Sequence, residues 1–169
     1  MRCCIATLLL IALSYSGNAQ TKPHDISSTQ LQAVIGLPLD QAVKQREQYK
    51  MPLRAAYKRQ IDLSDKDCSS VQGQQPYNIC MGNAGVQADN DFAAFYNNLQ
   101  MLCHTQDQLA TLQASEKAWE LYEQSTMQAT HASWPDGTGA PGFAGEVYLS
   151  LLRDRMRELY EIYGLNISQ

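Results

Sequence analysis

The sequence lacks the short motifs that mark most enzymes. It has no Gly-x-Ser-x-Gly nucleophile turn, no His-Glu-x-x-His zinc motif and no phosphate-binding loop, so the commonest hydrolase and nucleotide sites are missing. Its three histidines are scattered, and it has neither a Cys-x-x-Cys pair nor a haem attachment motif. Cys103, His104 and Met101 stand without a second cluster and would not close a metal coordination sphere. We therefore expect no catalytic site, no cofactor and no metal.

Paired carboxylates placed for acid and base catalysis are also missing. Asp89 and Asp91 are two positions apart, so on a helix they would not face each other. Glu116 and Glu120 would share a helical face, but we expect that face to be exposed to solvent. Neither pair supports an enzymatic function.

Long apolar runs are scarce. One run, from Ile5 to Leu13, follows Met1-Arg2 and is closed by the small residues of Gly17-Asn18-Ala19, which is the pattern of a secretory signal cut after Ala19. The run is too short to span a bilayer, which needs roughly 20 apolar residues. We predict a signal peptide over residues 1–19 and a mature chain without a membrane anchor, exported to the periplasm or secreted.

Basic residues are rare in the middle of the chain. Asp67 to Glu146 contains one basic residue, Lys117, against nine acidic ones, whereas Lys22 to Lys66 contains eight basic and five acidic residues. These segments therefore carry net charges of −8 and +3. The acidic segment makes nucleic acid an unsuitable partner and would attract a cationic protein. An acidic surface can also serve only to keep an exported protein soluble.

Cleavage of the signal would leave three cysteines: Cys68, Cys80 and Cys103. Exported compartments are oxidising, so a bridged pair is expected. Cys68 and Cys80 are twelve positions apart with turn-forming residues between them, and we predict a disulfide there. Cys103 would then either pack as a buried thiol or form an intermolecular disulfide that joins a dimer.

Apolar residues recur at helical spacing, and no segment shows the sustained alternation of a strand. A short helix is predicted from Ser27 or Ser28 to Ile35, and a second over residues 41–51, capped by Asp40. Pro52 is expected to begin a separate turn that runs to Ile61. The sequence leaves open whether this basic arm packs on the rest of the chain or extends from it.

Three longer helices are predicted over residues 76–104, 107–132 and 143–163, with Gly164 as the final cap. Their core-facing stripes are, in turn, Phe92, Phe95, Tyr96, Leu99, Leu102 and Cys103; Leu109, Leu112, Trp119 and Tyr122; and Tyr148, Leu152, Met156, Leu159 and Tyr163. We predict an all-α fold, a small antiparallel bundle with one disulfide. Residues 20–66 would form a helical extension, and residues 67–169 the main domain.

Five short stretches of the main domain carry a family resemblance. They are Asp67-Cys68 with Asn78-x-Cys80, Ala88-Asp89-x-x-Phe92-x-x-x-Tyr96, Ser115-Glu116-Lys117-Ala118-Trp119-x-x-Tyr122, Gly137-Thr138-Gly139 and Arg155-x-x-Glu158-Leu159. In this order and spacing they resemble the lysozyme inhibitor LprI-like family of bacterial exported proteins. The resemblance extends to Gly164 and leaves residues 22–66 uncovered.

The resemblance implies a protein that binds and blocks a lysozyme or a related cell-wall hydrolase, with Cys68 and Cys80 as the family's first cysteine pair. Lysozymes are commonly basic, so the acidic segment would speed encounter with one.

The glycine-rich loop between residues 133 and 142 is the candidate contact. Trp134 would be an apolar anchor, Gly137 and Gly139 would let the backbone approach closely, and Thr138 would offer a hydroxyl, with Asp136 beside them. Alternatively, Asp136 or Thr138 only shapes the turn into the last helix, and Trp134 tucks under the loop.

A second hypothesis is a periplasmic interaction or assembly module unrelated to lysozyme. Its contact to an acidic surface would be the basic arm from Lys44 to Lys66, with dimers formed through Cys103. The chain also departs from the family: Met127 and a position at about Val147 stand where many members have a second cysteine pair, and Ala93 replaces an asparagine. An apolar contact between Met127 and Val147 could replace the bridge, but it would not lower the entropy of the unfolded chain.

Overall fold

A computed structural model describes residues 29, 33, 37–63 and 68–168 of the chain. The signal peptide predicted over residues 1–19 and most of the first predicted helix lie outside these residues. The described elements are α2 (Leu39–Leu63), α3 (Gln74–Met101), α4 (Gln106–Ser133), α5 (Ala140–Ile162) and α6 (Gly164–Ser168). Because no strand occurs among them, the all-α prediction is confirmed.

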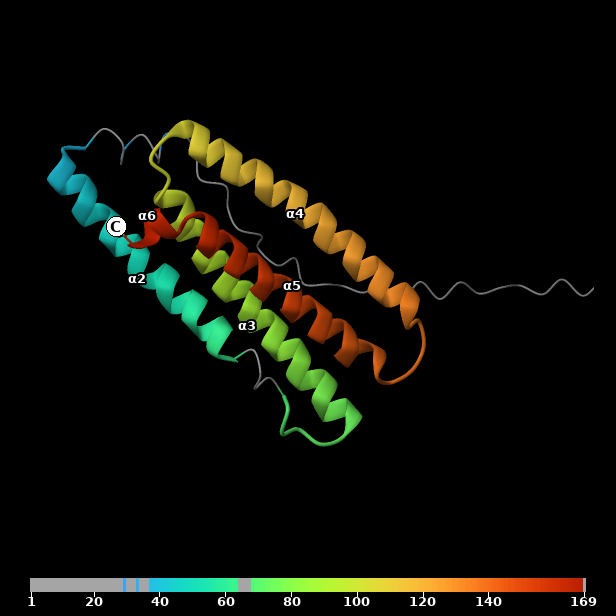
Figure 1. The fold of residues 1–169 in the computed structure, drawn as a ribbon. Coiled ribbons are helices and arrows are strands. Elements are labelled where there is room, and N and C mark those ends of the chain that lie inside the picture. Colours follow the sequence, from blue (N-terminus) through green and yellow to red (C-terminus); the bar gives the residue numbers. More distant parts are fainter. Residues whose placement is uncertain (1–28, 30–32, 34–36, 64–67, 169) are drawn as a thin grey trace, which may run out of the picture.

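The helices form an elongated antiparallel bundle (Figure 1). Helix α2 packs along α3, α3 packs on α5, and α5 supports α4 on its other side. The short α6 folds back at the far end of α5. No helix among the described residues is long and apolar enough to cross a membrane.

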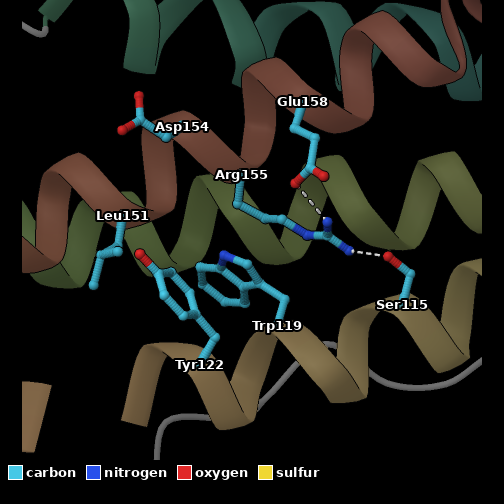
Figure 2. Close-up of a pocket in the computed structure, with 7 residues that line it drawn as sticks. All are labelled: Ser115, Trp119, Tyr122, Leu151, Asp154, Arg155 and Glu158. Carbon is cyan, nitrogen blue, oxygen red and sulfur yellow. Dashed lines mark hydrogen bonds and ion pairs between the residues drawn. The ribbon is translucent and has the colours of Figure 1, made fainter. Parts of the chain in front are cut away.

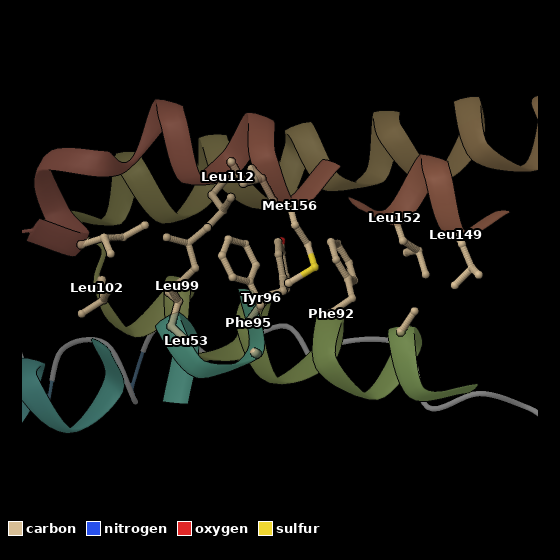
Figure 3. Packing of buried hydrophobic residues seen from close by; sticks show 14 of the residues in the cluster. Leu53, Phe92, Phe95, Tyr96, Leu99, Leu102, Leu112, Leu149, Leu152 and Met156 are labelled. Atoms are coloured by element: carbon tan, nitrogen blue, oxygen red, sulfur yellow. The ribbon is translucent and has the colours of Figure 1, made fainter. Parts of the chain in front are cut away.

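The core is built mainly by α3, as its apolar spacing predicted. Phe95, Tyr96, Leu99, Leu102 and Cys103 are fully buried, and Phe92 is nearly so. From α5, Leu152, Met156 and Leu159 pack against them. Figure 3 shows Phe92, Phe95, Tyr96 and Leu99 pointing toward Leu152 and Met156 between the helices. The α3 and α5 stripes therefore supply most of the apolar burial that stabilises the bundle.

The prediction that Pro52 begins a new turn is wrong, because α2 continues through it from Leu39 to Leu63. Proline removes one backbone N–H bond and usually kinks a helix. Here Pro52 is exposed, whereas Leu53 and Ala56 are fully buried. Burial of that face keeps the segment helical, and the basic arm packs on the bundle instead of extending from it.

A buried carboxylate ties α2 to α3. Asp91 accepts hydrogen bonds from Arg59 (Nη2, 2.5 Å), from Gln60 (2.7 Å) and from Gln87 on its own helix (3.2 Å). Arg153 of α5 reaches the Gln60 side-chain oxygen at 3.5 Å. Several donors satisfy the carboxylate, so its burial is tolerated.

The helix ends differ from the predictions by a few residues. Helix α4 is capped by Thr105, whose hydroxyl accepts from the Gln108 N–H at 3.1 Å. Helix α5 begins at Ala140 because Pro141 lies in its first turn, where proline is favoured. Gly164 does not close α5 as predicted: Tyr163 is the cap, and Gly164 begins α6.

The predicted disulfide is confirmed. Cys68 and Cys80 are bonded, with their Cα atoms 5.8 Å apart, so the segment before α3 is joined to its second turn. Cys103 is a free thiol with no exposed surface, and burial raises its pKa to about 12. Both facts agree with a packing role and leave no thiolate at the surface for an intermolecular disulfide.

Candidate functional site

The predicted contact loop lies at one end of the bundle, between α4 and α5. The Trp134 side chain is 46 % exposed, and its ring centre lies 5.3 Å from that of Phe143. Gly137 has φ of 111°, a conformation that other residues rarely adopt. A Cβ atom at Gly139 would lie 3.3 Å from the Trp134 ring. The indole therefore packs over both glycines while presenting about half of its surface to solvent.

The first turns of α3 hold this loop in place. Asn78 donates from its side chain to the Thr138 carbonyl at 2.7 Å and accepts from Gln74 at 2.9 Å. Behind the loop, Gly142 packs so closely on α3 that a Cβ atom there would lie 2.8 Å from Asn78 and 2.9 Å from the Tyr77 ring. Since Cys80 is one turn further along α3, the disulfide and the loop share one end of the bundle.

The polar residues of the loop are exposed to solvent and do not cap α5. Asp136 and Thr138 are exposed, and Gly139, the N-cap of α5, provides no side-chain cap hydrogen bond. The α5 cap is thus made without Asp136 or Thr138, and the alternative in which either residue only shapes the turn before α5 stays a prediction. The structure brings Trp134, Gly137 and Gly139 together, with Asp136 and Thr138 on the outer surface.

A second surface feature is a groove of about 540 Å³ between α4 and α5. Its lining residues are Ser115, Trp119, Tyr122, Leu151, Asp154, Arg155 and Glu158. Figure 2 shows the Trp119 and Tyr122 rings next to each other on α4, with Arg155 reaching from α5 toward Ser115. The groove thus combines an aromatic side with a charged side.

Arg155 organises the groove from within. Its side chain is buried, and its guanidinium donates to Glu116 (3.2 Å), Glu158 (2.7 Å) and Ser115 (2.8 Å). It also lies 5.9 Å from the centre of the Trp119 ring, within range of a cation–π interaction. These contacts fix α4 against α5 at the point where the core leucines of α4 end.

Glu116 was predicted to be exposed, and this is wrong: the residue is only 5 % exposed. Burial raises the pKa of Glu116 to about 7, and the Arg155 guanidinium opposes part of that rise. The sequence did hold a signal, because Glu116 follows Leu109 and Leu112 and precedes Trp119 at core-facing spacing. A charged residue at a core-facing position needs a buried partner of opposite charge. That partner, Arg155, is 39 positions away, so the local pattern did not identify it.

Tyr122, in contrast, was predicted to lie in the core but is 59 % exposed. Helix α4 has no buried residue between Glu116 and Thr130, so Tyr122 borders the groove without being covered. Trp119 is half-buried and stacks on Phe92 at 5.6 Å. Trp119 therefore packs partly on the core, whereas Tyr122 lies at the border of the groove.

Two of the stretches that carry the family resemblance line this groove. The Trp-centred stretch, Ser115 to Tyr122, and the Arg155-x-x-Glu158 stretch form its two walls. Sequence reasoning noted both stretches but assigned no binding role to either. No cluster of three histidine, cysteine, aspartate or glutamate side chains able to hold a metal occurs in the described part of the chain.

Comparison with known proteins finds a family match. A family model described as "Lysozyme inhibitor LprI" matches residues 68–159, a span that includes the disulfide, the loop and the groove. No curated protein and no solved structure matches the sequence.

Proposed function

Because the chain belongs to the lysozyme inhibitor LprI family, we propose that it binds and blocks a lysozyme or a related cell-wall hydrolase. The contact would be the loop from Trp134 to Gly139. The observation that carries this choice is the half-exposed Trp134, whose ring packs on Phe143 and over two glycines. A rigid aromatic anchor loses little conformational entropy on binding, so it suits a tight contact.

The shape of the target supports the same loop. A lysozyme active site is a groove that holds two carboxyl groups, so an inhibitor must fill it with apolar surface and hydrogen-bond donors. Trp134 supplies apolar surface with an indole N–H, and Thr138 supplies a hydroxyl on the exposed side of the loop. Asp136 would have to remain outside the carboxylate pair, because like charges repel there.

The net charge of the chain and its expected export also support the proposal. The net charge of −8 between Asp67 and Glu146 would attract a basic hydrolase and raise the association rate at low salt. Removal of residues 1–19 as a signal peptide would bring the chain to the periplasm or the medium, where cell-wall hydrolases act. The chain would act by occupying its target and not by catalysis.

The test is turnover of cell-wall substrate by several lysozyme types, titrated with the mature chain. Inhibition is expected, and Trp134→Ala should weaken it by about tenfold or more, since interface tryptophans often contribute 2 kcal/mol or more. Thr138→Ala should have a smaller effect. Leu165→Ala is a matched control, because Leu165 is an exposed apolar residue of α6 at the opposite end of the bundle.

Absence of inhibition with every lysozyme type would refute the inhibitor function. Inhibition that Trp134→Ala and Thr138→Ala leave unchanged would instead refute the choice of surface.

The alternative of an assembly module that uses the basic arm finds less support. Arg59 pairs with Asp91, Lys50 is buried and pairs with Glu47, and Arg54 donates to the Ile167 carbonyl. These three charges serve contacts within the bundle, whereas Lys44 and Lys58 are exposed, so only part of the arm is available to an acidic partner.

A further inference from the structure

Helix α4 has no buried residue over the stretch between Glu116 and Thr130. Its buried residues are Leu109, Leu112 and Glu116 toward its start and Thr130 toward its end. Between them, Leu121 and Tyr122 are exposed, and the groove opens toward α5. This stretch leaves aromatic surface uncovered, which in soluble proteins often marks an interaction site.

The groove presents chemistry suited to a cation. Trp119 and Tyr122 offer ring faces, and the Asp154 and Glu158 side chains on the α5 rim are 66 % and 55 % exposed. Arg155 already occupies a position over Trp119. Its guanidinium is engaged by Glu116, Ser115 and Glu158, so it is poorly available to an anionic ligand. A second cation could approach from the solvent side.

The surroundings favour the same sign of charge. The chain from Asp67 to Glu146, which includes α4, carries one basic residue against nine acidic ones, whereas residues 147–169, which include most of α5, are balanced at three and three. The net field at the groove is therefore negative, so it attracts cations and repels anionic peptides. On the α5 rim, Asp154 pairs only with the half-exposed Arg157, at 2.6 Å, among the ion pairs of the described residues. Such a surface pair is weak and can be exchanged for a partner's cation.

From these observations we infer that the groove between α4 and α5 binds a basic segment of a partner protein, with a lysine or arginine side chain held across Trp119 and Tyr122 and facing Asp154. The site is separate from the loop. From Tyr122 to Trp134 the chain advances twelve residues along α4, or about 18 Å at 1.5 Å per residue. The inference therefore goes beyond hydrolase inhibition and does not require it.

The experiment uses the mature chain carrying Trp134→Phe. Only Trp119 then reports fluorescence, since the chain has two tryptophans, and the loop anchor is removed. Deca-lysine is titrated at about 0.15 M salt, where distant charges are screened, and deca-glutamate serves as the opposite-charge probe. Deca-lysine should change Trp119 fluorescence with saturation, and deca-glutamate should not.

Two variants locate the binding. Tyr122→Ala should weaken deca-lysine binding roughly two- to fivefold, the range expected for an exposed cation–π contact. Asp154→Asn should weaken it by about two- to fivefold. Glu161→Gln removes the same charge two turns further along α5, outside the groove, and should change the affinity by less than about 1.5-fold if binding is local.

Three outcomes would overturn the inference: no saturable binding of deca-lysine, equal losses for Asp154→Asn and Glu161→Gln, or no loss for Tyr122→Ala. Quenching by a tetramer of N-acetylglucosamine in place of deca-lysine would also overturn it and assign the groove to a sugar. Because lysozyme is absent from this experiment, its result is independent of the inhibition assay. Either proposal can fail while the other stands.

Discussion

Arg155 and Glu116 form a buried ion pair across the α4–α5 interface, with Arg155 Nε 3.2 Å from Glu116 Oε2 and both side chains less than a tenth exposed. A pair of this kind contributes little net stability when complete, but it is costly to break. It also joins the two sequence stretches that line the groove. Stability and the shape of the groove therefore depend on the same contact.

At pH 8, where Glu116 is ionised in the folded chain, Arg155→Met should destabilise the fold by about 3–5 kcal/mol, because Glu116 would remain buried without its cation. Urea unfolding followed by circular dichroism would measure this loss. The double variant Glu116→Leu/Arg155→Met should recover most of the stability, since an apolar pair of similar volume can replace a buried ion pair. Additive losses in the double variant would contradict this account of the pair.

Glu116 should also make stability depend on pH. Burial raises the pKa of Glu116 in the folded chain from 4.5 to about 7, so between these values the folded state holds a proton that the unfolded state has lost. The contribution of Glu116 to stability should therefore fall as pH rises through this window and level off above it. At about 1.4 kcal/mol per unit, the change is of the order of 3 kcal/mol.

Glu116→Gln is the control for this prediction. The groups that act on Glu116 are Arg155 and Glu158 of α5 and Glu120 of α4, and all remain in the variant. The difference between the wild-type and Glu116→Gln unfolding free energies, measured from pH 4.5 to 8, should carry the predicted slope. A constant difference across this range would show that Glu116 keeps one protonation state.

Removal of the Cys68–Cys80 bridge should lower stability. This disulfide is the single intrachain bridge among the described residues. Cys68→Ser and Cys80→Ser should each lower the unfolding free energy by up to about 2–4 kcal/mol. Reduction of the wild type should cause a similar loss, and equal melting of all three oxidised proteins would contradict the prediction.

Gly142 should not tolerate a side chain. A Cβ atom there would lie 2.8 Å from Asn78 Oδ1 and 2.9 Å from the Tyr77 ring, so Gly142→Ala must displace these side chains or push α5 away from α3. Overpacking of this kind costs about 1–3 kcal/mol. It should also weaken lysozyme inhibition if the loop is the contact, because Asn78 positions Thr138.

Gly82→Ala provides the matched control on α3, because nothing lies within 4 Å of a Cβ atom at that position. It should stabilise the helix by about 0.5–1 kcal/mol. Thermal unfolding of both variants compares them directly, and equal melting temperatures would show that Gly142 has room to relax.

The α3 stripe and the disulfide could be predicted because both are local features. Apolar residues at helical spacing from Phe92 to Cys103 indicate a buried face whatever the partner helix is, and a twelve-residue separation with turn-formers favours a bridge between Cys68 and Cys80. The all-α fold follows from the same periodicity. These predictions depend on residues close together in sequence.

Other features depend on contacts between distant residues, and only the tertiary structure decided them. Pro52 stays helical because Leu53 is buried against the bundle, and α6 forms where Ile167 finds a buried position. Glu116 looked like a surface residue until Arg155 was placed beside it, and Tyr122 looked like a core residue until α4 proved to have no covering partner there. Apolar periodicity determined which helices form, whereas helix packing determined which polar groups are buried and where the groove opens.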